Sequence, residues 1–108
     1  MKNGLYKASF RTVVGQGTGV IVINDGLIKG GDSMMYYVGN FKEDANGAAT
    51  GALHIGKHSD FPGMQSVFNT NDLNLNFSGT STNTSATIHG FAEEAPTVPF
   101  DAQLTLIE

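Results

Sequence analysis

The chain has 108 residues, of which 40% are hydrophobic, and it contains no cysteine. That length suits a single domain over residues 1–108, and the missing cysteines exclude disulfides, thiol catalysis and thiolate zinc sites. Ten acidic and six basic residues give a net charge of −4, and the basic residues are scattered singly, so we expect no direct contact with nucleic acid.

The first third of the chain is typical of short strands separated by turns. Residues 4–13 alternate between apolar and polar side chains. Residues 20–23 are β-branched throughout, which predicts a strand with both faces covered. Residues 24–26 read Asn-Asp-Gly, a strong hairpin signal, because these residue types tolerate the positive φ of tight turns. A short return strand at 27–28 and a glycine-rich turn at 30–32 follow.

The middle of the chain predicts two longer strands. In residues 33–42 we place the odd positions inward, because Asn40 and Lys42 lie on the even side. Residues 43–47 form an acidic turn, and residues 49–58 form the next strand.

Residues 59–70 form the longest irregular stretch, which is long for a connection in a compact domain. Its apolar side chains suggest that it packs back over the domain, as one helical turn closing one end. In that position Phe61, Met64 and Phe68 would act as a lid.

Three further strands complete the pattern. Residues 73–78 alternate most clearly, and a loop rich in Ser, Thr and Asn follows at 79–85. Residues 86–91 and 100–107 alternate in the same way, with a turn at 93–96 between them.

Eight strands joined in sequence by short turns predict one architecture. The simplest solution is an all-β, antiparallel up-and-down barrel with at most one short helix, since no ten-residue run has a helical period. Closure also removes the exposed sheet edges that promote aggregation.

The barrel interior has two possible uses. An eight-stranded barrel encloses a space just wide enough for side chains or for one small ligand. If the interior is a ligand pocket, the inward side chains line it; these are Tyr6, Phe10, Met35, Tyr37, Phe41, Leu53, Ile55, Phe77 and Phe100. The same residues would otherwise fill a solid core.

The sequence contains no recognisable catalytic or metal-binding motif. His54 and His58 lie roughly 13 Å apart if both are on one strand, at about 3.3 Å per residue, and His89 is placed no better. Neighbouring Ser59 and Asp60 supply the residue types of a hydrolase triad, but adjacency in sequence is not triad geometry. We therefore expect no enzyme activity, no catalytic residues, no cofactor and no metal.

Several segments carry a resemblance to one family. They are residues 3–10, 30–32 followed by 35–41, 51–55 running on to 58, 66–68, and the closing strand at 100–106. In these segments, which cover nearly the whole chain, the sequence resembles the GrlR-type proteins, the negative regulators of type III secretion gene expression and their bacterial relatives.

The resemblance implies a lipocalin-like barrel, often dimeric, in the bacterial cytoplasm. It also implies action by holding a transcriptional activator rather than by touching DNA. The loop that matches the family's acidic surface loop carries Glu43 and Asp44, which become candidate partner-binding residues. The absence of an apolar segment after Met1 is consistent with a cytoplasmic protein without a membrane anchor. The leading hypothesis is a non-enzymatic regulatory protein that binds a protein partner and forms a homodimer; the rival is a barrel that binds a small apolar ligand or lipid.

Overall fold

The computed structural model describes residues 1–13, 15–60 and 72–108. In these residues there are eight β-strands and no helix, which confirms the predicted all-β class. The strands are β1 (Gly4–Arg11), β2 (Gln16–Asn24), β3 (Leu27–Gly31), β4 (Met35–Glu43), β5 (Ala48–Lys57), β6 (Asp72–Ser81), β7 (Ser85–Ala92) and β8 (Ala95–Leu106).

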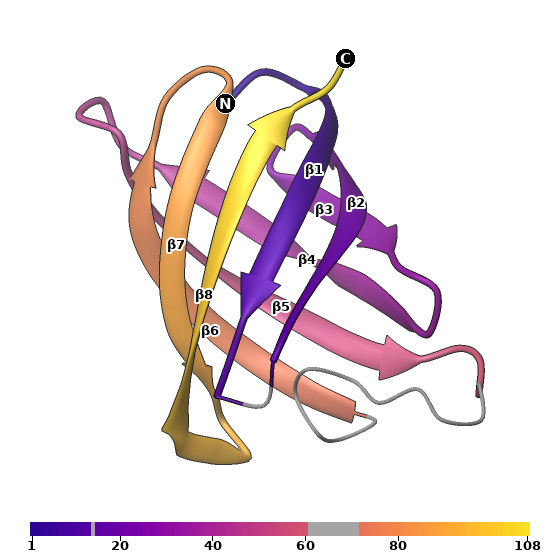
Figure 1. The fold of residues 1–108 in the computed structure, drawn as a ribbon. Coiled ribbons are helices and arrows are strands. Elements are labelled where there is room, and N and C mark those ends of the chain that lie inside the picture. The colour runs from indigo at the N-terminus through magenta and orange to yellow at the C-terminus, as the bar shows by residue number, and fades with distance from the viewer. Residues whose placement is uncertain (14, 61–71) are drawn as a thin grey trace.

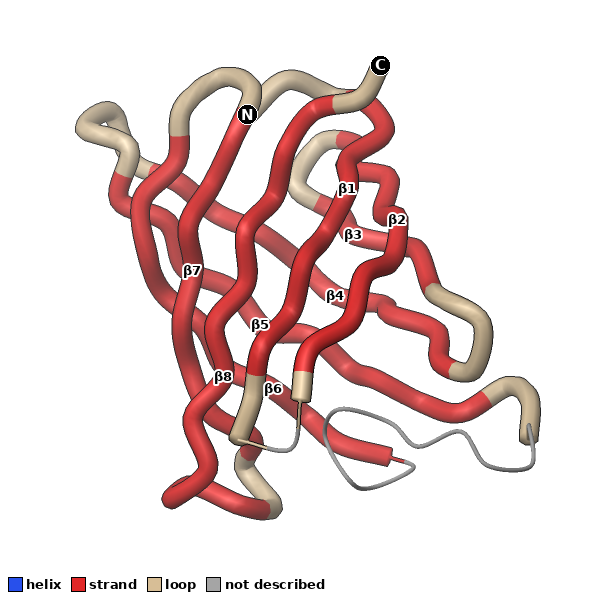
Figure 2. Tube along the Cα trace, in the orientation of Figure 1, coloured by secondary structure: helices blue, strands red, loops and turns tan. Residues whose placement is uncertain are grey.

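The strands form a closed up-and-down barrel, as predicted. Each strand pairs antiparallel with the next, and β1 also pairs with β8, where Tyr6 lies opposite Leu106. Figure 1 shows β7, β8, β1 and β2 running steeply across the near side, with β3, β4 and β5 crossing obliquely behind them. Figure 2 shows strand along most of the described trace, with short turns joining β2 to β3, β3 to β4, β4 to β5, β6 to β7 and β7 to β8.

The core is the inner face of the barrel, and sequence alternation decides which side chains enter it. In β4, Met35, Tyr37 and Phe41 are buried, whereas Tyr36 and Val38 are exposed. This confirms the inward placement of the odd positions. The same alternation buries Leu73, Leu75 and Phe77 in β6 and Ala102 and Leu104 in β8. All the buried side chains in the described residues are hydrophobic by class.

Inward-facing glycines make room for the largest rings. Phe77 on β6 lies opposite Gly51 on β5 and Gly90 on β7. A Cβ at position 51 would come within 2.3 Å of the Phe77 ring and 2.2 Å of the Asn40 carbonyl oxygen. Glycine is therefore required at 51 because a backbone and a ring both approach it closely.

Several strand ends differ from the sequence prediction. β1 ends at Arg11 rather than at 13, β2 already begins at Gln16, and β3 continues to Gly31. β6 extends to Ser81, inside the predicted 79–85 loop, and β8 begins at Ala95, inside the predicted 93–96 turn. In β2, β3 and β6 the added residues pair with a neighbouring strand, so tertiary pairing overrides the low strand propensity of Gly and Ser.

The prediction that both faces of residues 20–23 are covered is wrong. Ile21 and Ile23 are buried, but Val20 and Val22 point outward and are 47% exposed. β-Branched side chains indicate strand backbone and do not by themselves show that the second face is covered.

Candidate functional site

The nine predicted lining side chains all lie inside the barrel. They come from five of its strands, β1, β4, β5, β6 and β8, and none is more than 9% exposed. The residues are Tyr6, Phe10, Met35, Tyr37, Phe41, Leu53, Ile55, Phe77 and Phe100. The predicted lid residues Phe61, Met64 and Phe68 lie outside the described residues.

The interior aromatic rings pack against one another. Phe10 and Tyr37 meet edge to face with ring centroids 5.2 Å apart, and the Phe41 and Phe77 centroids are 6.4 Å apart. The space enclosed by Phe10, Leu53, Phe77 and their neighbours measures about 20 Å³. That volume is close to what one water requires and far below the roughly 300 Å³ of a small-ligand site. This part of the interior is therefore filled by side chains.

One polar contact reaches into the interior at the β3–β4 turn. The Tyr37 hydroxyl donates to Asp32 Oδ2, while Asp32 Oδ1 accepts from the backbone N–H groups of Met34 and Met35 at 2.9 and 2.8 Å. Burial, and then the hydrogen bond and charge of Asp32, raise the pKa of the Tyr37 phenol above its ordinary value. This contact holds the turn to the core.

The predicted partner-binding acids both make contacts within the chain. Glu43 binds the Met1 ammonium and accepts a hydrogen bond from the Ser81 hydroxyl. These two hydrogen bonds, that of the ammonium first, hold the pKa of the Glu43 carboxyl below its ordinary value. Asp44 Oδ1 accepts from the N–H groups of Asn46 at 2.8 Å and Ala48 at 3.0 Å. Asp44 therefore stabilises the β4–β5 turn.

His58 lies beside Ser59 and Asp60, the residue types of a hydrolase triad. His58 Nδ1 is 2.7 Å from Ser59 Oγ, its Nε2 is 2.9 Å from the Asp32 carbonyl oxygen, and Asp60 pairs with Lys57. The carboxylate of Asp60 thus points to a lysine rather than to the imidazole. Within the described ranges, no group of three or more His, Cys, Asp or Glu side chains could hold a metal ion.

An exposed hydrophobic surface lies on the outside of β2, β3 and β4. We call it the outer apolar face, and its side chains are between 39% and 59% exposed: Val20, Val22, Leu27, Tyr36 and Val38. Val20 and Tyr36 lie on either side of Gly31, and Val22 and Val38 lie on either side of Lys29. Gly31 places no side chain between Val20 and Tyr36, and the Lys29 side chain between Val22 and Val38 has an aliphatic stem.

A groove crosses the outer side of β4, β5 and β6. This β4–β6 groove has a volume of about 470 Å³, and its outward side chains are Val38, Asn40, Ala52, His54, Asn74, Asn76 and Glu93. Ala52 lies between Asn40 and Asn76 in one cross-strand row, and His54 lies between Val38 and Asn74 in the next. The small Ala52 side chain between two longer ones leaves the row hollow.

A hydrogen-bond network joins the groove to the β7–β8 turn. Glu94 accepts from the backbone N–H of Asn74 at 2.9 Å and from its Nδ2 at 3.0 Å. His54 bridges Asn74 Oδ1 at 3.0 Å and Asp72 Oδ1 at 3.1 Å. The pKa of the Glu94 carboxyl lies below its ordinary value. The largest cause is the hydrogen bond from the Asn74 backbone N–H, followed by those from the backbone N–H of Glu94 itself and from the Asn74 side chain, and then by the charge of nearby His54.

Sequence reasoning did not find this network, although it placed Asn74 and Asn76 on the face opposite Leu73 and Leu75. The residues come from strands separated by up to several tens of positions, and only the register brings them together. A run of asparagines on one strand face is the single local signal that pointed toward it.

Fold and site thus define a closed eight-stranded antiparallel barrel with a filled inner face and two distinctive outer surfaces. Comparison with protein-family models and with curated proteins gives no match. Among the described residues, no helix has the length and hydrophobicity needed to cross a bilayer.

Proposed function

We propose that this chain is a non-enzymatic regulatory protein that acts by binding another protein through the outside of its barrel. The observation that carries the proposal is the outer apolar face. Single-chain soluble proteins rarely expose contiguous hydrophobic patches of this kind, and such patches commonly mark interaction sites. Five exposed hydrophobic side chains gather here on three adjacent strands.

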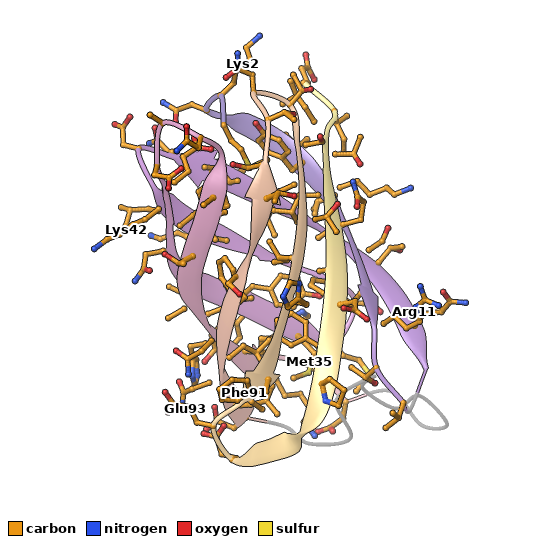
Figure 3. The ribbon with its side chains drawn as sticks, turned by 90° about the vertical axis from the view of Figure 1, so that its left-hand side faces the viewer. Lys2, Arg11, Met35, Lys42, Phe91 and Glu93 are labelled. Atoms are coloured by element: carbon orange, nitrogen blue, oxygen red, sulfur yellow. The ribbon has the colours of Figure 1, made fainter. Side chains whose placement is uncertain are left out.

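The same surface suits a homodimer. Val22 and Val38 flank Lys29 on a regular sheet face, and a two-fold axis would pack this face against its own copy. The resemblance to negative regulators of type III secretion genes supports a bacterial, cytoplasmic setting and a transcriptional activator as the partner. DNA is disfavoured as a direct partner because the net charge is −4 and Lys2, Arg11 and Lys42 project from separate places (Figure 3).

The alternative function is a barrel that binds a small apolar ligand or lipid. It would use Tyr37, Phe41 and their inward neighbours as the lining. The small space of about 20 Å³ beside Phe10, Leu53 and Phe77 argues against it.

Two matched measurements separate these functions. The wild-type chain and the variant V22K/V38K are used as bait for purified candidate activators, with circular dichroism to confirm that both are folded. We expect a partner to bind the wild type and to be lost from the variant. Solvent extraction and mass spectrometry of the purified wild type supply the second readout. A stoichiometric apolar molecule in the extract, together with no partner bound by the wild type, would show the alternative function.

A further inference from the structure

The β4–β6 groove is a second candidate site, outside the barrel interior; it borders the outer apolar face and shares Val38 with it. Its volume of about 470 Å³ falls within the range of small-molecule sites. Asn40, Ala52 and Asn76 form one row across three strands, so the two asparagines stand about 10 Å apart, twice the spacing between neighbouring strands. Figure 3 shows Glu93 at one end of the barrel, close to Phe91.

The network behind the groove fixes which way its amides point. A carboxylate only accepts hydrogen bonds, so the nitrogen of Asn74 must face Glu94, and the nitrogen of Asn76 must face Glu93 Oε1 at 3.0 Å. The oxygen of Asn74 then faces His54. Asn76 consequently keeps its oxygen free, together with the second hydrogen of its amide.

Most of the negative charge near the groove is already paired. Both oxygens of Glu94 are held by Asn74, and Asp72 is held by His54. Among the described polar side chains that line the groove, the groups without a hydrogen-bond partner in the chain are the whole Asn40 amide, Asn76 Oδ1 and Glu93 Oε2. This set contains donors as well as acceptors. A cation would use only the acceptors, whereas a hydroxyl both donates and accepts and can therefore also bind the exposed N–H groups of Asn40.

The apolar part of the lining suits the same ligand class. Val38 and Ala52 offer aliphatic contact between the polar rims, and a sugar ring presents C–H groups on its faces and hydroxyls around its edge. We propose that the β4–β6 groove binds a hydroxyl-rich ligand, a saccharide unit, seated on Ala52 with its hydroxyls on Asn40 and on Asn76 with Glu93.

Nuclear magnetic resonance of the ¹⁵N-labelled chain tests this directly. D-glucose, D-galactose, D-mannose and N-acetyl-D-glucosamine are titrated one at a time, followed by an oligosaccharide of the best of them. We expect saturable shifts at roughly millimolar concentration for at least one sugar, because a small ligand in an open groove makes few contacts. The shifted signals should be the backbone amide of Ala52 and the side-chain amides of Asn40 and Asn76. Tighter binding of the oligosaccharide than of the single sugar would indicate that the natural ligand is a glycan chain rather than a free sugar.

Two variants and a matched control localise the binding. Ala52→Leu fills the groove and should weaken binding at least tenfold, and Asn40→Ala should weaken it severalfold without disturbing the fold, since this side chain makes no hydrogen bond in the described structure. Ala48→Leu, the same change at an exposed position on β5 outside the groove, should bind as the wild type does. The proposal is overturned if no sugar shifts these signals at 50 mM, or if Ala52→Leu binds normally. N-acetyl-arginine methylamide is titrated in the same way as a cationic probe. If it shifts these signals and no sugar does, the proposal is also overturned.

Discussion

The buried hydroxyl of Tyr37 donates a hydrogen bond to the carboxylate of Asp32, five residues earlier in the chain. The other oxygen of Asp32 accepts from the backbone of Met34 and Met35. One carboxylate therefore closes the β3–β4 turn and fixes the orientation of a core aromatic side chain.

Tyr37→Ala should cost roughly 3–5 kcal/mol of unfolding free energy, as other large aromatic truncations in packed cores do. Tyr37→Phe keeps the ring and should cost roughly 1–3 kcal/mol, because Asp32 loses its donor. Urea denaturation followed by circular dichroism measures both values. A Tyr37→Ala cost below about 1 kcal/mol would mean that the ring borders open space rather than a filled core.

The raised pKa of Tyr37 predicts a loss of stability at high pH. The unfolded chain releases this phenolic proton above its ordinary pKa of about 10, while the folded chain retains it. The unfolded state then binds fewer protons, so the unfolding free energy falls as the pH rises above 10, by at most about 1.4 kcal/mol per pH unit for this group. Denaturation curves between pH 8 and 11.5 should show a steeper fall for the wild type than for Tyr37→Phe. Parallel curves for the two proteins would show that Tyr37 is not the group responsible.

Glu94 should contribute to stability only while it is ionised. Its lowered pKa, caused first by the backbone N–H of Asn74, means that the stabilisation is complete above the ordinary carboxyl pKa and is lost as the pH falls through the lowered value. Acid titration of the wild type and of Glu94→Gln, followed by thermal melts, checks this. The two melting temperatures should differ at pH 7 and converge at low pH. A difference that persists at the lowest pH would point to packing rather than charge.

Asp44 should be needed for its side-chain oxygen rather than for its charge. Asp44→Ala removes the acceptor for the N–H groups of Asn46 and Ala48 and should cost about 1 kcal/mol, similar to the loss of a helix cap. Asp44→Asn keeps an acceptor oxygen at the same place and should leave the melting temperature almost unchanged. Partner binding should therefore be tested with Asp44→Asn, with Glu43→Gln as the companion change. Equal destabilisation by both Asp44 variants would contradict this role.

Alternation along the strands was sufficient to predict the barrel and its inner face. In β6, Leu73, Leu75 and Phe77 alternate with polar residues, and in β4 the polar Asn40 and Lys42 mark the outward face. A strand has only two faces on which to place these side chains. Every residue predicted to line the interior is buried, because each lies in phase with its neighbours on the strand.

The surface sites needed information that local patterns do not carry. Val20 and Val22 suggested a strand covered on both sides, but what covers a face depends on the neighbouring elements. His54 and Asn74 meet because β5 and β6 pair in one particular register, and a shift of one residue would separate them. Glu43 and Asp44 were predicted as partner-binding residues, and the contacts that Met1, Ser81 and the turn backbone make with them could not be predicted from local pattern.

Sedimentation equilibrium of the wild type and of V22K/V38K tests the role of the outer apolar face most directly. At tens of micromolar protein, the wild type should sediment at twice the chain mass of 11.4 kDa. V22K/V38K should sediment as a single chain with an unchanged circular dichroism spectrum, because two further lysines beside Lys29 would place three adjacent ammonium groups of each chain in the interface, where they repel those of the other copy and are costly to desolvate. A wild type that remains a single chain, or a variant that still pairs, would contradict the assignment of this face as the interaction surface.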